Sequence, residues 1–283
     1  MLKIKYLLFS ALCCLSVATA AQSPVRFHNE AADTARITGL LNMAVGIKDS
    51  GERIAVIGQQ FVDVPYVAHT LEGESEQLTV NLDELDCTTF VETVMALAYT
   101  AGEGRTSWRD FVYNLQRLRY RGGNVDGYAS RLHYICDWVI DNVHRGNFRD
   151  VTGTFPAYSY VVRTINFMSE NRDKYPALAD SAQYARIKSV ELGYNNHRFP
   201  YVKSSALGEK ATRNAFHNGD VVALVSKMKN LDVTHMGIII MQEGVPYLLH
   251  ASQSGGRVEL SRLPLAEFMK KNTGLMGVRV FRL

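Results

Sequence analysis

The sequence is poor in cysteine, with four in 283 residues, and in proline, with seven. Cys13 and Cys14 lie in an apolar stretch near the start of the chain, which leaves Cys87 and Cys136 in the rest of it. Two cysteines are too few for the disulfide framework of a small secreted domain. The sequence also lacks C-x-x-C, H-x-x-x-H and H-E-x-x-H patterns, so it predicts no metal site and no cofactor.

The chain also lacks a strong charge of one sign and a long apolar run. Its formal net charge is +3 and it carries no basic stripe, so no nucleic-acid partner is expected. The apolar stretch 6–17 is shorter than the roughly 20 residues of a bilayer span, so we expect no stable membrane insertion. It follows Lys3 and Lys5 and ends in Ala18-Thr19-Ala20. This pattern predicts a signal peptide over 1–20, cleavage near Ala20, and export to the periplasm or beyond.

Residues 21–283 are predicted to form a single α+β domain, because no repeat or Pro/Gly/Ser-rich linker divides them. Residues 30–205 are expected to be mostly helical and residues 215–283 mostly β, in an antiparallel meander. Helical periodicity predicts helices over 31–47, 83–99, 107–120, 132–143, 161–168, 178–192 and 265–271. Short β-rich segments predict strands over 220–225, 235–241, 247–251, 257–260 and 277–283.

Cys87 is the strongest candidate for a functional residue. Acidic residues precede it and an apolar-periodic run follows, so it is expected in or near the first turn of a helix. The positive end of a helix dipole stabilises a thiolate, and its free N–H groups can hold an oxyanion. The alternatives are a half-buried structural cysteine in a helix that Asp86 caps, or a disulfide between Cys87 and Cys136. We interpret Cys136 as a buried packing residue.

His235 and His250 are the candidate base and its orienting partner. They lie on successive predicted strands with Glu243-Gly244 between them. A two- or four-residue loop would place both on one face of the sheet, whereas a three-residue loop would separate them. A nucleophilic cysteine needs such a base and orienter. A zinc site of Cys87, His235 and His250, or two histidines without a function, are the alternatives.

In these residues the chain resembles the NlpC/P60 superfamily of bacterial cell-wall cysteine hydrolases. The matching segments are Pro65-Tyr66, Asp86-Cys87-Thr88-Thr89-Phe90-Val91, Gly219-Asp220-Val221-Val222, His235-Met236-Gly237-Ile238 and Leu249-His250-Ala251-Ser252. The resemblance implies a papain-like fold, in which the nucleophile helix packs on an antiparallel sheet, with added N-terminal and inserted helices. It also implies catalytic roles for Cys87, His235 and His250, with Tyr66 lining the active site.

A narrower resemblance is to the N-acetylmuramoyl-L-alanine amidase-like branch. It rests on Tyr120-Arg121-Gly122-Gly123, Ser130-Arg131-Leu132-His133-Tyr134 and Asp137-Trp138. It implies an enzyme that cleaves between N-acetylmuramic acid, in its 1,6-anhydro form, and L-Ala of muropeptides. We expect the protein to be a monomer. The alternatives are an endopeptidase cutting between D-Glu and the diamino acid, or a muropeptide-binding module without activity. The expected substrate-binding residues are Asp86, Arg131, His133, Asp137 and Trp138.

Overall fold

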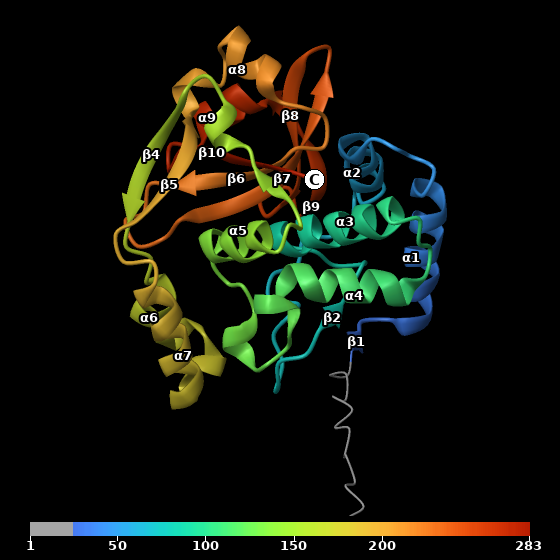
Figure 1. The fold of residues 1–283 in the computed structure, drawn as a ribbon, viewed down its shortest axis with the longest axis vertical. Coiled ribbons are helices and arrows are strands. Elements are labelled where there is room, and N and C mark those ends of the chain that lie inside the picture. Colours follow the sequence, from blue (N-terminus) through green and yellow to red (C-terminus); the bar gives the residue numbers. More distant parts are fainter. Residues whose placement is uncertain (1–24) are drawn as a thin grey trace, which may run out of the picture.

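The computed structural model describes residues 25–283, and the predicted signal peptide 1–20 with Cys13 and Cys14 lies outside them (Figure 1). The described chain pairs a helical half with one large sheet. No helix within residues 25–283 is long and apolar enough to cross a membrane. The helices are α1 (Glu30–Ala44), α2 (Ser50–Gln59), α3 (Cys87–Gly102), α4 (Trp108–Arg119), α5 (Ile135–His144), α6 (Phe167–Glu170), α7 (Ser181–Leu192), α8 (Lys210–Ala215) and α9 (Leu265–Lys271).

The main sheet has eight strands and is antiparallel throughout. Its order is β4-β5-β10-β6-β7-β8-β9, with β3 pairing β10. Strands β6 to β9 therefore form the predicted meander, and the last strand returns to lie between β5 and β6. The bounds are β3 (Arg149–Asp150), β4 (Tyr158–Arg163), β5 (His197–Lys203), β6 (Val221–Ser226), β7 (Val233–Gln242), β8 (Val245–Ser252), β9 (Arg257–Pro264) and β10 (Leu275–Arg282). Two short strands, β1 (Arg26–Phe27) and β2 (Thr79–Val80), pair in parallel elsewhere.

Helix α3 is the central helix of the fold. It contacts α1, α2 and α4 as well as β7 and β8 (Figure 1). Most of its side chains are buried, and Phe90 and Val94 share a core with Met236 and Ile238 of β7. The other face of the sheet buries a second cluster under α9, with Leu265 and Met269 among its members. Because both faces of the sheet are covered by packed side chains, the sheet has a fixed position relative to Cys87, the first residue of α3.

The sequence-based helices at 31–47, 83–99, 107–120, 132–143, 178–192 and 265–271 are confirmed, as are the five C-terminal strands. The helix expected at 161–168 is wrong, because 158–163 forms β4 and only 167–170 is helical. Strand β5 also lies inside the region expected to be mostly helical. β4 is an edge strand whose residues alternate between exposed and half-buried. Its apolar run is too short for the hydrophobic periodicity to distinguish a strand from a helix. Helix α2 was not predicted.

Candidate active site

Helix α3 begins at Cys87, as the sequence indicated, because Asp86 caps it. Oδ1 of Asp86 accepts N–H bonds from Thr88 at 3.0 Å and Thr89 at 2.8 Å. The Thr89 hydroxyl accepts the N–H of Asp86 at 2.8 Å, which completes a capping box. The structure therefore gives the Asp86 carboxylate a capping role. Its contact with substrate stays a prediction.

Cys87 is half-buried as a residue and makes no disulfide. The backbone N–H of Met236, the residue after His235, lies close enough to the sulfur to lower the pKa of Cys87, so the thiol lies near the start of β7. Burial, followed by the negative charge of Asp86, raises the pKa of Cys87 to about 11. The dipole of α3 acts in the opposite direction. With so high a pKa, the resting group is a thiol, and an attack by sulfur requires a base.

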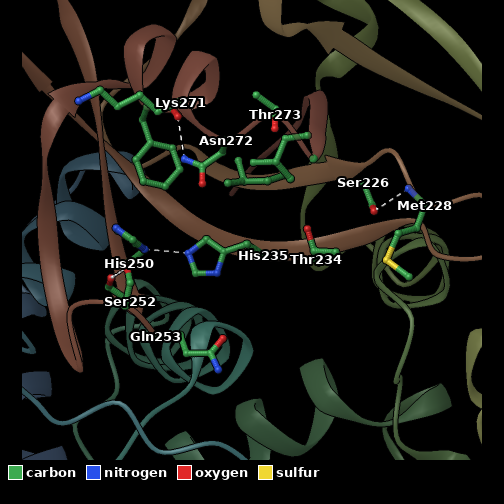
Figure 2. A pocket seen from close by; sticks show the side chains of 15 residues that line it. Ser226, Met228, Thr234, His235, His250, Ser252, Gln253, Lys271, Asn272 and Thr273 are labelled. Carbon is green, nitrogen blue, oxygen red and sulfur yellow. Dashed lines mark hydrogen bonds between the residues drawn. The ribbon is translucent and has the colours of Figure 1, made fainter.

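The hairpin β7–β8 brings the two histidines together on one face of the sheet. Gln242 pairs with Val245, so the loop has two residues, Glu243 and Gly244, with φ of 50° and 77°. Positive φ at both positions is the type I′ turn that suits such hairpins. His235 Nε2 lies 2.8 Å from His250 Nδ1 (Figure 2). The matching parity expected for a two-residue loop is confirmed.

Gly237 makes room for this contact. The register of the hairpin, continued from Ile238 and Leu249, places Gly237 opposite His250. A Cβ at Gly237 would lie 2.7 Å from Leu248 Cδ1, 2.8 Å from Leu249 O and 3.1 Å from His250 Cβ. A side chain here would displace the very strand that carries His250.

Both imidazoles are expected to be neutral at neutral pH. Burial lowers the pKa of His235 to about 3, with His250 adding to the effect. Burial also lowers the pKa of His250 to about 4, although Glu259 opposes it. Because Nε2 of His235 is used by His250, Nδ1 is the nitrogen left to accept a proton. Within residues 25–283, no hydrogen bond joins it to the Cys87 thiol. Such contacts often shorten only when substrate binds.

Tyr66 lies near Cys87 and Asp86. Its N–H donates to Gly256 O at 2.9 Å, and it forms a bridge with Leu85, just before Asp86. Burial raises the pKa of Tyr66, and the charges of Cys87 and Asp86 raise it further. The phenol therefore stays protonated and can donate a hydrogen bond beside the sulfur.

A cavity of about 850 Å³ opens along the histidine pair (Figure 2). His235 and His250 line it together with polar side chains from the end of β8 and from the segment after α9. Among the described residues that line it there is no Asp or Glu, and neither Cys87 nor Tyr66 is among them. The lining is Leu224, Ser226, Met228, Thr234, His235, His250, Ser252, Gln253, Ser254, Phe268, Lys271, Asn272, Thr273, Gly274 and Leu275.

Two expected substrate residues have structural roles instead. Trp138 is fully buried against Phe148 and Phe281, so its prediction as a substrate contact is corrected to a core residue. Asp137 is 4% exposed and accepts two bonds from Arg121, at 2.7 and 2.6 Å, and one from the Tyr194 hydroxyl. Its oxygens are occupied within the protein.

Arg131 and His133 also lie outside the cavity lining. Arg131 pairs with Glu72 at 2.7 Å and with Glu76 at 3.4 Å. His133 Nε2 lies 2.8 Å from Tyr128 O, and burial lowers its pKa to about 3. Their contact with substrate stays a prediction. The polar residues that do line the cavity, Gln253 and 271–273, were missed, because only the packing of α9 against β8 and β9 brings 271–273 to this cavity.

Cys136 is a free, buried thiol. Its backbone N–H donates to Asp232 at 2.6 Å and its sulfur lies 3.5 Å from Arg279. The alternative disulfide with Cys87 is therefore absent, and Cys136 packs as expected. Residues 25–283 contain no group of three Cys, His, Asp or Glu side chains placed to hold a metal ion.

Comparison with known proteins gives one family. Residues 56–276 match the AmiA-like family, described as N-acetylmuramoyl-L-alanine amidase-like. No curated protein matches. Among solved structures, an N-acetylmuramoyl-L-alanine amidase from Bacteroides uniformis is 38% identical, with a TM-score of 0.78 over 82% of this chain and 98% of that one.

Two further structures share the fold. A candidate xylanase from Bacteroides fragilis is 38% identical, with a TM-score of 0.75 over 80% of this chain and 99% of that one. A Legionella pneumophila protein is 21% identical, with a TM-score of 0.71 over 90% and 96% of the two chains. From the match over most of its length, the chain belongs to the N-acetylmuramoyl-L-alanine amidase-like family.

Proposed function

We propose that this protein is a cysteine-dependent amidase of the NlpC/P60 superfamily with a papain-like fold. It hydrolyses the amide between N-acetylmuramic acid, in its 1,6-anhydro form, and L-Ala of peptidoglycan fragments. The observation that carries the proposal is the His235–His250 contact of 2.8 Å, made from the strand whose Met236 N–H lies near the Cys87 thiol. This arrangement supplies a nucleophile, a base and an orienter from three separate elements.

In the first step His235 Nδ1 takes the proton of the Cys87 thiol as the sulfur attacks the amide carbonyl carbon. The carbonyl oxygen becomes an oxyanion, which the Cys87 N–H and the Tyr66 hydroxyl stabilise. His235 then returns the proton to the nitrogen of L-Ala, so the C–N bond breaks and a thioester remains. Water gives a proton to His235 and attacks the thioester, which releases the sugar carboxylate and restores the thiol.

The amidase family supports a substrate derived from peptidoglycan, and peptidoglycan itself lies outside the cytoplasmic membrane. We therefore keep the predicted signal peptide 1–20 and export as part of the proposal, along with a single catalytic domain over 21–283 that acts as a monomer. The matched segment 56–276 covers the nucleophile, both histidines and Tyr66.

The test is incubation of the protein without residues 1–20, and of its Cys87→Ala variant, with a defined 1,6-anhydro-muropeptide. Mass spectrometry of the products should show free stem peptide and peptide-free sugar from the wild type only. A muropeptide with a reducing-end sugar, run in parallel, tests the preference for the anhydro form.

Other outcomes would replace the proposal. A cut between D-Glu and the diamino acid would make the protein an endopeptidase with the same catalytic residues. Binding of the muropeptide by the wild type without cleavage of any bond would indicate a binding module. Cleavage by the Cys87→Ala variant would refute the nucleophile.

A further inference from the structure

The histidine pair requires a defined arrangement of protons. To accept the thiol proton, Nδ1 of His235 must be bare, so a neutral His235 carries its proton on Nε2. That Nε2–H donates to Nδ1 of His250, which must then carry its own proton on Nε2. The opposite arrangement makes an equally short 2.8 Å contact, but it puts the His235 proton on Nδ1 and disables the base. A further group must favour the productive form.

Glu259 of β9 is placed to do so. In the β8–β9 register Glu259 pairs directly with His250, and directly paired residues of antiparallel strands point to the same face. Its carboxylate folds back over the hairpin that follows His250. A Cβ at Gly255 in that hairpin would lie 2.4 Å from Glu259 Oε1 and 2.9 Å from Oε2. The absence of a side chain at Gly255 is what makes room for the carboxylate.

No other side chain within residues 25–283 neutralises the charge of Glu259. There it forms no ion pair and no hydrogen bond, although it is half-buried. The Nε2 of His250 likewise has no hydrogen-bond partner among the described residues. The other side of this ring packs edge-on against Phe268, with ring centroids 5.4 Å apart, and His250 itself is 5% exposed.

We propose that Glu259 is a positioning residue that holds His250 in its Nε2–H tautomer and so keeps Nδ1 of His235 free for the thiol proton. The inference rests on the proposed roles of Cys87 and His235. It adds a fourth member, Glu259, behind the Cys87–His235–His250 set. Glu259 touches neither substrate nor sulfur and acts through His250.

The same carboxylate stabilises the positive charge that the pair gains when the thiol gives up its proton. The charge of Glu259 raises the pKa of His250, against the larger effect of burial. The titratable groups that face His250 are His235 of β7 and Glu259 of β9, and Lys271 of α9 lines the same cavity. Loss of Glu259 therefore lowers the pKa of the pair, because the only acid in this set is removed.

The experiment compares the wild type with Glu259→Gln, Glu259→Asp and the control Glu267→Gln. Glu267 is an exposed acid on α9 that pairs with Lys270. Imidazole ¹⁵N shifts of the resting protein report both tautomers without any substrate. We expect Nε2–H for both histidines in the wild type and the control, and a mixture in Glu259→Gln. Glu259→Asp should recover most of the wild-type pattern.

Kinetics give the second readout. We expect kcat of Glu259→Gln to fall about ten-fold, equivalent to one pKa unit of lost stabilisation of the imidazolium, with KM unchanged. The acid limb of its pH profile should move to lower pH. Wild-type tautomers and an unmoved acid limb in Glu259→Gln would overturn the proposal. A tautomer shift in a protein that cleaves no muropeptide would keep the role of Glu259 and reject the proposed function.

Discussion

Replacement of Gly237 by alanine tests whether the close approach of β7 to His250 is required. The added Cβ would lie 2.7 Å from Leu248 Cδ1, 2.8 Å from Leu249 O and 3.1 Å from His250 Cβ. The first contact can be relieved by a small rotation of a leucine, but the second is with backbone. The two strands must therefore separate by several tenths of an ångström. Overpacking of this kind costs about 1–3 kcal/mol of unfolding free energy.

The functional effect should exceed the effect on stability. His235 Nε2 and His250 Nδ1 are 2.8 Å apart, and an increase of half an ångström takes them beyond the ordinary range of a good hydrogen bond. The base then loses its fixed orientation. We expect kcat on the muropeptide to fall about 100-fold, in line with the usual cost of small misplacements of catalytic groups.

The assay combines urea unfolding with kcat and KM on the same preparation. The matched control is Gly39→Ala, since Gly39 lies within α1 and a Cβ there meets nothing within 4 Å. Alanine should stabilise that helix by about 0.5–1 kcal/mol and leave kcat unchanged. A Gly237→Ala protein with wild-type stability and wild-type kcat would refute the argument from close approach.

Three further predictions follow from the pKa values and the contacts. The unfolding free energy should fall as the pH falls from 6.5 towards 3, because the folded pKa values of His235 and His250 are about 3 and about 4 while unfolded histidines titrate near 6.5. Urea unfolding measured against pH should show a flatter decline of this free energy in the His235→Gln/His250→Gln variant. An equal decline in the variant and the wild type contradicts the prediction. Asp86→Asn keeps a capping oxygen but removes the charge that raises the pKa of Cys87, so the pH midpoint of Cys87 alkylation by iodoacetamide should fall. Asp86→Ala should lower the same midpoint and also lose about 1 kcal/mol of unfolding free energy. An unmoved midpoint in both variants counts against the electrostatic effect. Arg121→Ala leaves Asp137 with only its Tyr194 bond, so the unfolding free energy should fall by about 1–3 kcal/mol with KM unchanged. A raised KM at full stability would return Asp137 to the substrate-binding residues.

The site was more predictable than the sheet around it. Cys87 at the start of a helix, and His235 and His250 on adjacent strands, follow from local signals: an acidic cap, an apolar-periodic run and a two-residue turn. Each of these signals lies within about ten residues of the group it positions. The sequence left the loop length open, and the structure selects two residues, Glu243 and Gly244.

The failures depend on contacts distant in sequence. Strand β4 is a strand because it pairs with β5, some forty residues away, and no local pattern states that partner. Asp137 looked like part of a polar binding motif, but both of its oxygens are bonded by Arg121. Glu259 was not singled out, because its relation to His250 exists only once the β8–β9 register is known.

A raised pKa at Cys87 and lowered pKa values at the histidines favour a neutral resting pair over a thiolate and imidazolium. In the proposed mechanism, the charges appear only during the reaction. They need groups already in place: the N–H of Cys87 and the Tyr66 hydroxyl for the oxyanion, and Glu259 for the imidazolium. A resting thiol also explains why burial at the start of α3 is tolerable, since an uncharged sulfur loses little on leaving water. Alkylation of Cys87 by iodoacetamide should accordingly be slow at neutral pH and rise steeply above pH 9, and a fast, pH-independent reaction from pH 5 upward would show a resting thiolate instead.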